Sequence, residues 1–208
     1  MAHLSSGNFS KTKKKKRKPV AVTFIVPLFN HLRETRVMLK TLEASLPAGI
    51  SYELIFVNDA STDGTAKWLA GHRNSLIRVI TNRTNLGYAK SNNKAAKAAK
   101  GTLLCLLNND LVFGLGGLEP MLEILKDKAL GVGIVGNVQY RVVDGSLDHA
   151  GVAITPFGKI EHIQNLADNC PAWMQVTAVT GACLLIRKSD FVAAKGFDEA
   201  FINGGEDM

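Results

Sequence analysis

The chain has 208 residues, 46% of them hydrophobic, which is enough to form the core of one α/β domain but too short for two domains of ordinary size. No apolar run approaches the ~18 residues needed to span a bilayer, and the N-terminal basic run is not followed by the apolar segment of a secretory signal. The three cysteines show no CxxC spacing, which favours a reducing compartment over a disulfide framework or a zinc site. We therefore expect a cytoplasmic protein.

The net charge of +7 comes from one end of the chain. Residues 1–20 contain seven Lys and Arg residues and no acid, so the remaining 18 basic residues balance the 18 acidic residues of the chain. Residues 1–19 are therefore expected to be a disordered basic arm, either simply solvated, left over from cloning, or attracted to anionic lipid headgroups at the inner face of the plasma membrane. No aromatic residue is interleaved with the arm's charges, which argues against a nucleic-acid partner.

The first half of the ordered chain alternates predicted strands and helices. Runs of apolar and β-branched residues predict strands at 22–29, 53–57, 77–80 and 102–107. Helical spacing, Ala- and Lys-rich composition and turn signals predict helices at 33–46, 89–100 and 118–126, and a short one that opens at Ser61 or Asp63 as its N-cap. This order predicts a mainly parallel sheet flanked by helices.

The second half of the chain does not continue this alternation of strands and helices. We expect a short strand at 132–135, a hairpin turn at Asp144-Gly145, an irregular segment from 149 to 171, an apolar stretch at 176–186 and a short helix at 189–195 that ends at Gly196. We divide the domain, residues 20–208, into a nucleotide-binding part of about 20–127 and an acceptor-side part of about 128–208.

Polar residues follow each of the first four predicted strands. In open α/β sheets, ligands bind at the carboxyl ends of the strands, so these residues are expected to surround a site. They are Asn30, Asn58-Asp59, Asn82-Arg83 and Asn108-Asn109-Asp110.

Each of these motifs also has a purely structural interpretation. Asp59 either stabilises its loop or binds the base or ribose of a nucleotide. Gly87, after Asn85, either belongs to a capped helix start or allows a phosphate to approach the helix N-terminus. Asp110 is either a turn former or a ligand for a hard cation such as Mg²⁺. The chain has no GxGxxG motif and no P-loop, which disfavours a dinucleotide enzyme or a P-loop NTPase.

Six short motifs together resemble glycosyltransferase family 2, over about residues 21–208. Each is weak alone, but their order and spacing match the family. They are Val26-Pro27-Leu28-Phe29-Asn30, the stretch from Val57 to Thr65, Asn82 with Asn85-Leu86-Gly87, Leu107-Asn108-Asn109-Asp110, the stretch from Val179 to Cys183, and Gly196-Phe197-Asp198-Glu199 running into Gly205-Glu206-Asp207.

The resemblance implies a GT-A-type nucleotide-binding fold and an inverting glycosyltransferase that uses Mg²⁺ or Mn²⁺. It implies transfer from a UDP- or dTDP-linked sugar to a hydroxyl on a glycan or lipid-linked acceptor, in cell-surface polysaccharide or glycolipid synthesis. Asp110 would bind the metal, and Asp207 would be the catalytic base with Glu206 beside it. The nucleotide sugar would lie against Pro27, Asn30, Asp59, Asn82, Asn85, Gly87, Asn108 and Asn109.

The chain departs from the family pattern in two places. The metal-binding DXD motif is Asn108-Asn109-Asp110 here, which leaves one carboxylate for the cation. The sequence ends one residue after Asp207, where family members continue, so we expect the C-terminus to be incomplete. These departures keep open a nucleotide-binding pseudoenzyme on the same fold. A nucleotidyltransferase is disfavoured, because the loop after the first strand lacks the expected Gly-rich, basic sequence.

Overall fold

The computed structural model describes residues 19–201. The basic arm lies outside this range except for Pro19, and the candidate catalytic residues Glu206 and Asp207 lie outside it as well. None of the helices in the described range is long and apolar enough to cross a membrane.

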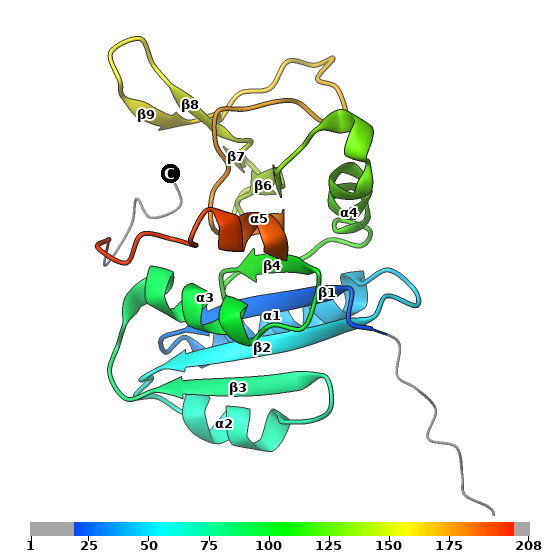
Figure 1. The fold of residues 1–208 in the computed structure, drawn as a ribbon. Coiled ribbons are helices and arrows are strands. Elements are labelled where there is room, and N and C mark those ends of the chain that lie inside the picture. Colours follow the sequence, from blue (N-terminus) through cyan, green and yellow to red (C-terminus); the bar gives the residue numbers. More distant parts are fainter. Residues whose placement is uncertain (1–18, 202–208) are drawn as a thin grey trace, which may run out of the picture.

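A six-stranded sheet in the order β3-β2-β1-β4-β10-β5 forms the centre of the fold (Figure 1). Strands β1 to β4 run parallel to one another, whereas β10 runs antiparallel to both β4 and β5. The expected mainly parallel sheet is therefore confirmed. The strands are β1 (Val22–Leu28), β2 (Tyr52–Asp59), β3 (Ile77–Asn82), β4 (Leu103–Leu107), β5 (Ile134–Gly136) and β10 (Cys183–Arg187).

Helices cover both faces of this sheet, as the alternating sequence predicts. One face packs against α1 (Leu32–Ser45), α2 (Thr65–His72) and α4 (Glu119–Lys126) through side chains such as Leu42, Leu69 and Met121. The other face packs against α3 (Gly87–Ala98) and α5 (Lys188–Ala193). A short 3₁₀ helix, η1 (Lys128–Leu130), follows α4.

The central strands are continuous apolar runs in the sequence because helices cover both of their faces. Phe24 and Val26 of β1 belong to one core cluster and Ile25 to the other, and all three are fully buried. Alternate residues of a strand point to opposite faces, so a strand between two helical layers needs apolar side chains at every position. Cys105 and Cys183 are buried in this core as free thiols.

The segment after η1, which is predicted from the sequence to lie on the acceptor side, is less irregular than expected. It contains two small antiparallel hairpins, β6 (Gln139–Tyr140) with β7 (Leu147–His149) and β8 (Val152–Ile154) with β9 (Ile160–His162). The Asp144-Gly145 turn lies in the first hairpin, as predicted, with Gly145 in the left-handed conformation at φ 70°. The second hairpin was missed because its strands are three residues long, too short for an alternating pattern to be recognised.

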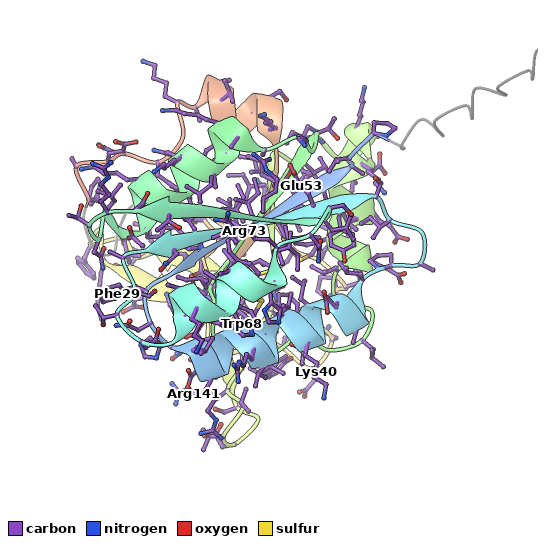
Figure 2. All side chains as sticks on the ribbon, turned by 90° about the horizontal axis from the view of Figure 1, so that it is seen from below. Phe29, Lys40, Glu53, Trp68, Arg73 and Arg141 are labelled. Atoms are coloured by element: carbon purple, nitrogen blue, oxygen red, sulfur yellow. The ribbon has the colours of Figure 1, made fainter. Side chains whose placement is uncertain are left out.

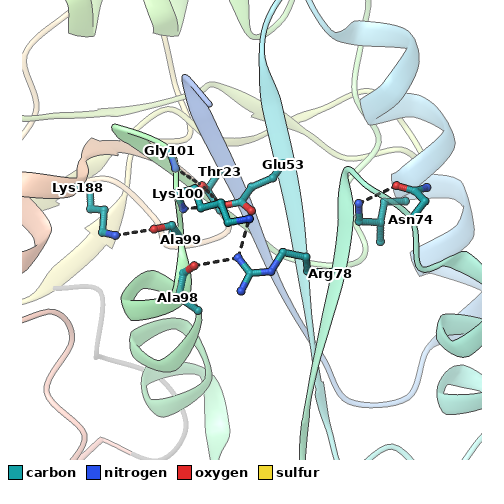
Figure 3. A network of polar contacts seen from close by, with 10 residues as sticks. Thr23, Glu53, Asn74, Arg78, Ala98, Ala99, Lys100, Gly101 and Lys188 are labelled. Atoms are coloured by element: carbon teal, nitrogen blue, oxygen red, sulfur yellow. Dashed lines mark hydrogen bonds and ion pairs between the residues drawn. The ribbon is translucent and has the colours of Figure 1, made fainter. Parts of the chain in front are cut away.

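The end of the sheet opposite the strand-end site is held by a buried carboxylate (Figure 3). Glu53 of β2 is 3% exposed and accepts hydrogen bonds from the Thr23 hydroxyl at 2.9 Å and from the backbone N–H of Lys100. Arg78 of β3 approaches the other oxygen of Glu53 at 3.2 Å and also donates to the carbonyl of Ala98. These bonds connect β1, β2, β3 and the turn between α3 and β4.

Candidate active site at the strand ends

The loop after β1 and the loop after β2 are joined by Asn30. Its Oδ1 accepts the backbone N–H of Thr62 at 2.8 Å and that of Asp63 at 3.3 Å, and its own backbone N–H donates to the Ser61 hydroxyl at 2.9 Å. The Asn58 side chain accepts the N–H of Ser61 at 3.0 Å. These polar groups therefore fix the shape of the β2–α2 loop.

Three residues other than glycine adopt positive φ at the ends of β1 and β2. Asn30, His31 and Ala60 have φ values of 62°, 58° and 62°. Such residues are uncommon, and strained backbone tends to gather at functional sites. The strain here is held by the hydrogen bonds of the Asn30 and Ser61 side chains.

Asp59, at the end of β2, fastens the start of helix α3. Its Oδ1 accepts the Asn82 side-chain amide at 2.8 Å and the N–H of Leu86 at 2.9 Å, and its Oδ2 accepts the N–H of Gly87 at 2.9 Å. The residue is only 4% exposed. The N–H groups of a first helical turn have no partner within the helix, so the carboxylate satisfies donors that would otherwise be unpaired.

Gly87 has a conformational requirement as well as a hydrogen bond. Its φ is 80°, a value that residues with a Cβ rarely adopt, and its N–H is shared between Asp59 and the Asn85 side chain, each at 2.9 Å. The structure therefore brings Asp59, Asn82, Asn85 and Gly87 together at one corner of the sheet, as the sequence motifs suggest.

The candidate metal motif follows β4, which lies on the other side of β1 from β2. The backbone N–H of Asn108 donates to the carbonyl of Ala182 at 2.8 Å, and the Asn109 side chain donates to the Thr35 hydroxyl of α1 at 3.1 Å. Asp110 is exposed. The two asparagines thus anchor the turn to the segment before the neighbouring strand β10 and to helix α1, while the carboxylate faces solvent.

The donor set at this turn fits a hard cation. Within residues 19–201, no three His, Cys, Asp or Glu side chains are grouped so that they could hold a metal together. A Mg²⁺-type site needs only one or two protein carboxylates when phosphate and water oxygens complete its shell, and Asp110 is accessible for that role.

Pro27 lies inside β1, opposite Val57 of β2. Proline has no N–H to donate to a neighbouring strand, and the pairing of β1 with β4 ends at Ile25. Pro27 therefore lies beyond the last residue of β1 that pairs with β4, where the lack of an N–H donor is tolerated. The position is one residue before the end of β1, and its contact with a nucleotide sugar stays a prediction.

The N-cap residue of α2 is Gly64, one residue after the predicted Asp63, and the other predicted N-cap, Ser61, lies further from the helix. Asp63 instead accepts the N–H of Thr65 at 2.9 Å and that of Leu32, the first residue of α1, at 3.3 Å. The Ser61 hydroxyl is engaged by Asn30. The turn residues of this loop thus hold two helices together, which local sequence cannot show.

Sequence reasoning missed the polar face of α3. Ser91, Asn92 and Asn93 are buried among alanines, Ser91 contacts Asn82 at 3.1 Å, and Lys94 donates to Asn82 at 2.6 Å. The Tyr88 hydroxyl donates to the carbonyl of Gly181, just before β10. The available signal was a run of polar residues at helix positions where the Ala spacing predicts burial.

A groove in the described surface lies away from the strand-end residues. This groove of about 570 Å³ separates α1 from α2 and is lined by Arg36, Lys40, Trp68 and Arg73 among others (Figure 2). None of the predicted site residues lines it. Its shape alone therefore does not identify a catalytic centre, and the strand ends are favoured because of the polar groups found there.

Comparison with known proteins assigns the chain to a family. The model of glycosyl transferase family 2 matches residues 23–192, which is most of the chain and covers both the Asp59 corner and the Asp110 turn. The chain belongs to glycosyl transferase family 2.

Two bacterial relatives are similar over most of this chain. The uncharacterized protein y4gI of Sinorhizobium fredii is 29% identical over 86% of the chain, and the O-antigen biosynthesis protein RfbC of Myxococcus xanthus is 30% identical over 92% of it. The matched regions make up 21% and 16% of those two proteins, so this chain spans only a fraction of the length of its curated relatives.

Solved structures confirm the GT-A glycosyltransferase fold. A mannosyltransferase from Pyrobaculum calidifontis, in complex with GDP-Man and Mn²⁺, superposes with a TM-score of 0.64 at 18% identity, covering 92% of this chain and 50% of that one. GalNAc-T7 with UDP, GalNAc and Mn²⁺ superposes with a TM-score of 0.70 at 14% identity, covering 91% of this chain and 39% of that one.

Proposed function

We propose that this domain transfers a sugar from a nucleoside diphosphate sugar to a hydroxyl group, with inversion at the anomeric carbon and with a divalent cation held by Asp110. The observation that carries the proposal is the gathering of polar groups from β1, β2, β3 and β4 at one edge of the sheet of a family 2 domain. The name of the relative RfbC supports a role in cell-surface polysaccharide synthesis.

The Asp59 corner is the proposed place for the nucleotide. A carboxylate has about four acceptor positions, and protein donors occupy three of those of Asp59. The fourth remains for an N–H of a base or a hydroxyl of ribose. Asn82 donates to Asp59 directly, and Asn30 shapes the β2–α2 loop that follows Asp59. We propose that these residues, together with Pro27, line the nucleotide, and that the nucleotide is UDP or dTDP.

The Asp110 turn is the proposed place for the cation, Mg²⁺ or Mn²⁺. The oxygens of Asp110 and Asn108 are ligands of the right chemistry, and two structural neighbours are described as complexes with Mn²⁺. When bound, the cation supplies charge neutralisation to the departing diphosphate. The protein's own contribution is to fix the turn through Asn108 and Asn109, so that the carboxylate stands at the strand edge.

Asp207, with Glu206 beside it, is the proposed general base; both lie outside the described residues. In a single displacement, the acceptor oxygen forms a bond to the anomeric carbon as the bond from that carbon to the diphosphate oxygen breaks. The hydroxyl proton passes to the carboxylate. Attack from the face opposite the leaving group inverts the configuration. The acceptor is proposed to be a glycan or a lipid-linked glycan.

Calorimetric titration of the chain with UDP, dTDP and GDP, each with and without Mn²⁺, tests the nucleotide and metal assignments. We expect UDP or dTDP to bind more tightly with Mn²⁺ than without it, and the Asp110→Asn variant to lose this difference. Preference for GDP would overturn the donor assignment. Equal affinity with and without Mn²⁺ in the parent protein would remove Asp110 from the metal role.

A further inference from the structure

Helix α3 buries polar side chains where an amphipathic helix normally buries apolar ones. Ser91 and Asn92 are fully buried and Asn93 is 6% exposed, on the side of the helix that also carries the buried Ala95 and Ala96. Buried polar groups must find hydrogen-bond partners, or they destabilise the fold. The partners of these side chains therefore indicate what the helix is built to hold.

Asn93 forms three hydrogen bonds with one remote segment. Its Nδ2 donates to the Phe197 carbonyl at 2.9 Å and to the Glu199 carboxylate at 3.1 Å, and its Oδ1 accepts the Phe197 N–H at 3.0 Å. The side chain thus satisfies both backbone groups of Phe197, more than a hundred positions further along the chain. A single amide that pairs with both groups of one residue fixes the position of that residue closely.

Gly196 makes this approach possible. A Cβ at this position would lie 2.3 Å from Asn93 Oδ1, and the φ of Gly196 is 74°. Any other residue would therefore collide with the Asn93 side chain and adopt a strained backbone. Gly196, which follows helix α5, therefore leaves the space that the Asn93 side chain of α3 occupies.

The opposite end of α3 belongs to the nucleotide corner. Asp59 accepts the N–H groups of Leu86 and Gly87 at the first turn of the helix. Asn93 follows Gly87 by six residues, about 9 Å along the axis at 1.5 Å per residue. A short, hydrogen-bonded helix therefore connects the proposed nucleotide contact rigidly to the segment 196–199, which precedes Glu206 and Asp207 in the sequence.

We propose that Asn93 is a positioning residue for sugar transfer, which sets the segment 196–199 of the acceptor side at a fixed distance from the nucleotide corner. This inference rests on the proposed function. Asn93 contacts neither the nucleotide nor the acceptor in this scheme. Its loss should therefore reduce turnover and leave nucleotide affinity unchanged, because a displacement of about 1 Å in a reacting group costs about 100-fold in rate.

The test replaces Asn93 by aspartate in the longest form of the chain that its gene encodes. The introduced carboxylate keeps the acceptor for the Phe197 N–H, but it has no N–H to donate to the Phe197 carbonyl, and it places a second negative charge against Glu199. The double variant, which combines Asn93→Asp with Glu199→Gln, removes this repulsion, because the introduced glutamine amide donates to the new carboxylate. Lys97→Ala, at an exposed position of the same helix, is the matched control.

We expect Asn93→Asp to lower kcat about 100-fold for release of UDP or dTDP from a panel of UDP- and dTDP-linked hexoses. KM for the donor and calorimetric affinity for UDP or dTDP with Mn²⁺ should stay within about twofold of the parent. The double variant should recover part of kcat, because it removes the charge repulsion but does not restore the donor to the Phe197 carbonyl, and Lys97→Ala should match the parent. Parental kcat in Asn93→Asp, or a parallel loss of nucleotide affinity without rescue in the double variant, would overturn the positioning role.

A second measurement separates this inference from the proposed function. If the parent protein releases no nucleotide from any donor, the transferase assignment fails, but amide hydrogen exchange still reports the coupling. UDP or dTDP with Mn²⁺ should slow exchange of the Phe197 amide in the parent and in Lys97→Ala, and not in Asn93→Asp. An equal response in all three proteins would show that α3 does not couple the two sites.

Discussion

The Asp59 carboxylate and the Gly87 backbone N–H are joined by a 2.9 Å hydrogen bond that links the end of β2 to the start of α3. The same carboxylate binds Leu86 and Asn82. One buried side chain therefore both completes the fold at this corner and stands where the nucleotide is proposed to bind. The structural and functional interpretations of Asp59 are compatible, and a substitution there should affect both stability and binding.

We expect Asp59→Asn to destabilise the fold by about 1–3 kcal/mol, because an amide N–H would then face a backbone or side-chain N–H that needs an acceptor. Urea denaturation measures the change. Asp110→Asn is the matched control: this carboxylate is exposed, so its replacement should leave the free energy of unfolding within about 0.5 kcal/mol of the parent. Equal stability of both variants would contradict the fastening role of Asp59.

Glu53 should make the stability depend on pH in the acid range. Burial alone would raise the pKa of Glu53, but hydrogen bonds from the Lys100 N–H, the Thr23 hydroxyl and Arg78, with the charge of Arg78, outweigh burial and hold this pKa below its ordinary value. A lowered folded-state pKa stabilises the fold above the unfolded-state pKa of about 4.3. This stabilisation is lost as the pH falls through the folded-state pKa.

Urea denaturation between about pH 7 and pH 3 measures this loss. Glu53→Gln should be less stable than the parent at neutral pH, and the difference should shrink as the solution is acidified, because protonation removes the same charge from the parent. A constant difference across this range would show that the charge of Glu53 contributes nothing.

The basic arm is expected to act only at an anionic surface. Deletion of residues 1–18 should leave thermal stability unchanged and weaken binding to phosphatidylserine-containing vesicles, with the largest loss at low salt, because surface attraction is screened over a Debye length of about 10 Å at 0.1 M. Neutral vesicles are the control. If vesicle binding is equal with and without the arm, the arm is a solvated tail that does not contribute to membrane binding.

The sheet could be predicted from sequence because each central strand is buried on both faces. Continuous apolar runs such as residues 22–28 identify the type of element, and the short loops between them set the parallel order. The antiparallel β10 and the hairpin β8–β9 were not predicted as such. A pairing between segments far apart in the chain, such as Cys183 with Leu107, leaves no local pattern.

The grouping of polar residues at the strand ends was predictable, because the position of each residue along the chain decides it. Polar residues after strands meet at one edge whatever their individual roles, so Asp59, Asn82 and Gly87 could be grouped correctly. The partners of Asn93 could not be predicted from the sequence. A helix of Ala, Lys and Asn forms its own backbone hydrogen bonds whatever its surroundings, whereas the Asn93 side chain bonds residues 197 and 199, far along the chain. The metal and base assignments, Asp110 and Asp207, stay predictions.

Asp207→Asn is expected to abolish sugar transfer and to spare nucleotide binding. An amide keeps the shape of the carboxylate but cannot accept the proton of the acceptor hydroxyl, and loss of a general base typically costs about 10²–10⁴-fold in turnover. Asp59 ends β2 and Asp110 follows β4, whereas Asp207 comes nearly 100 residues after Asp110 in the chain, so the donor contacts should be unaffected.

Nucleotide release under saturating donor, together with calorimetry of UDP or dTDP binding, measures the two effects of Asp207→Asn separately in the longest form of the chain that its gene encodes. Glu206→Gln is the neighbouring control and should retain turnover closer to the parent. If Asp207→Asn turns over at the parental rate while Glu206→Gln does not, the base is Glu206. If the parent itself binds nucleotide and transfers nothing, the domain is a nucleotide-binding pseudoenzyme, and the residue that distinguishes the two functions must be sought outside Asp207.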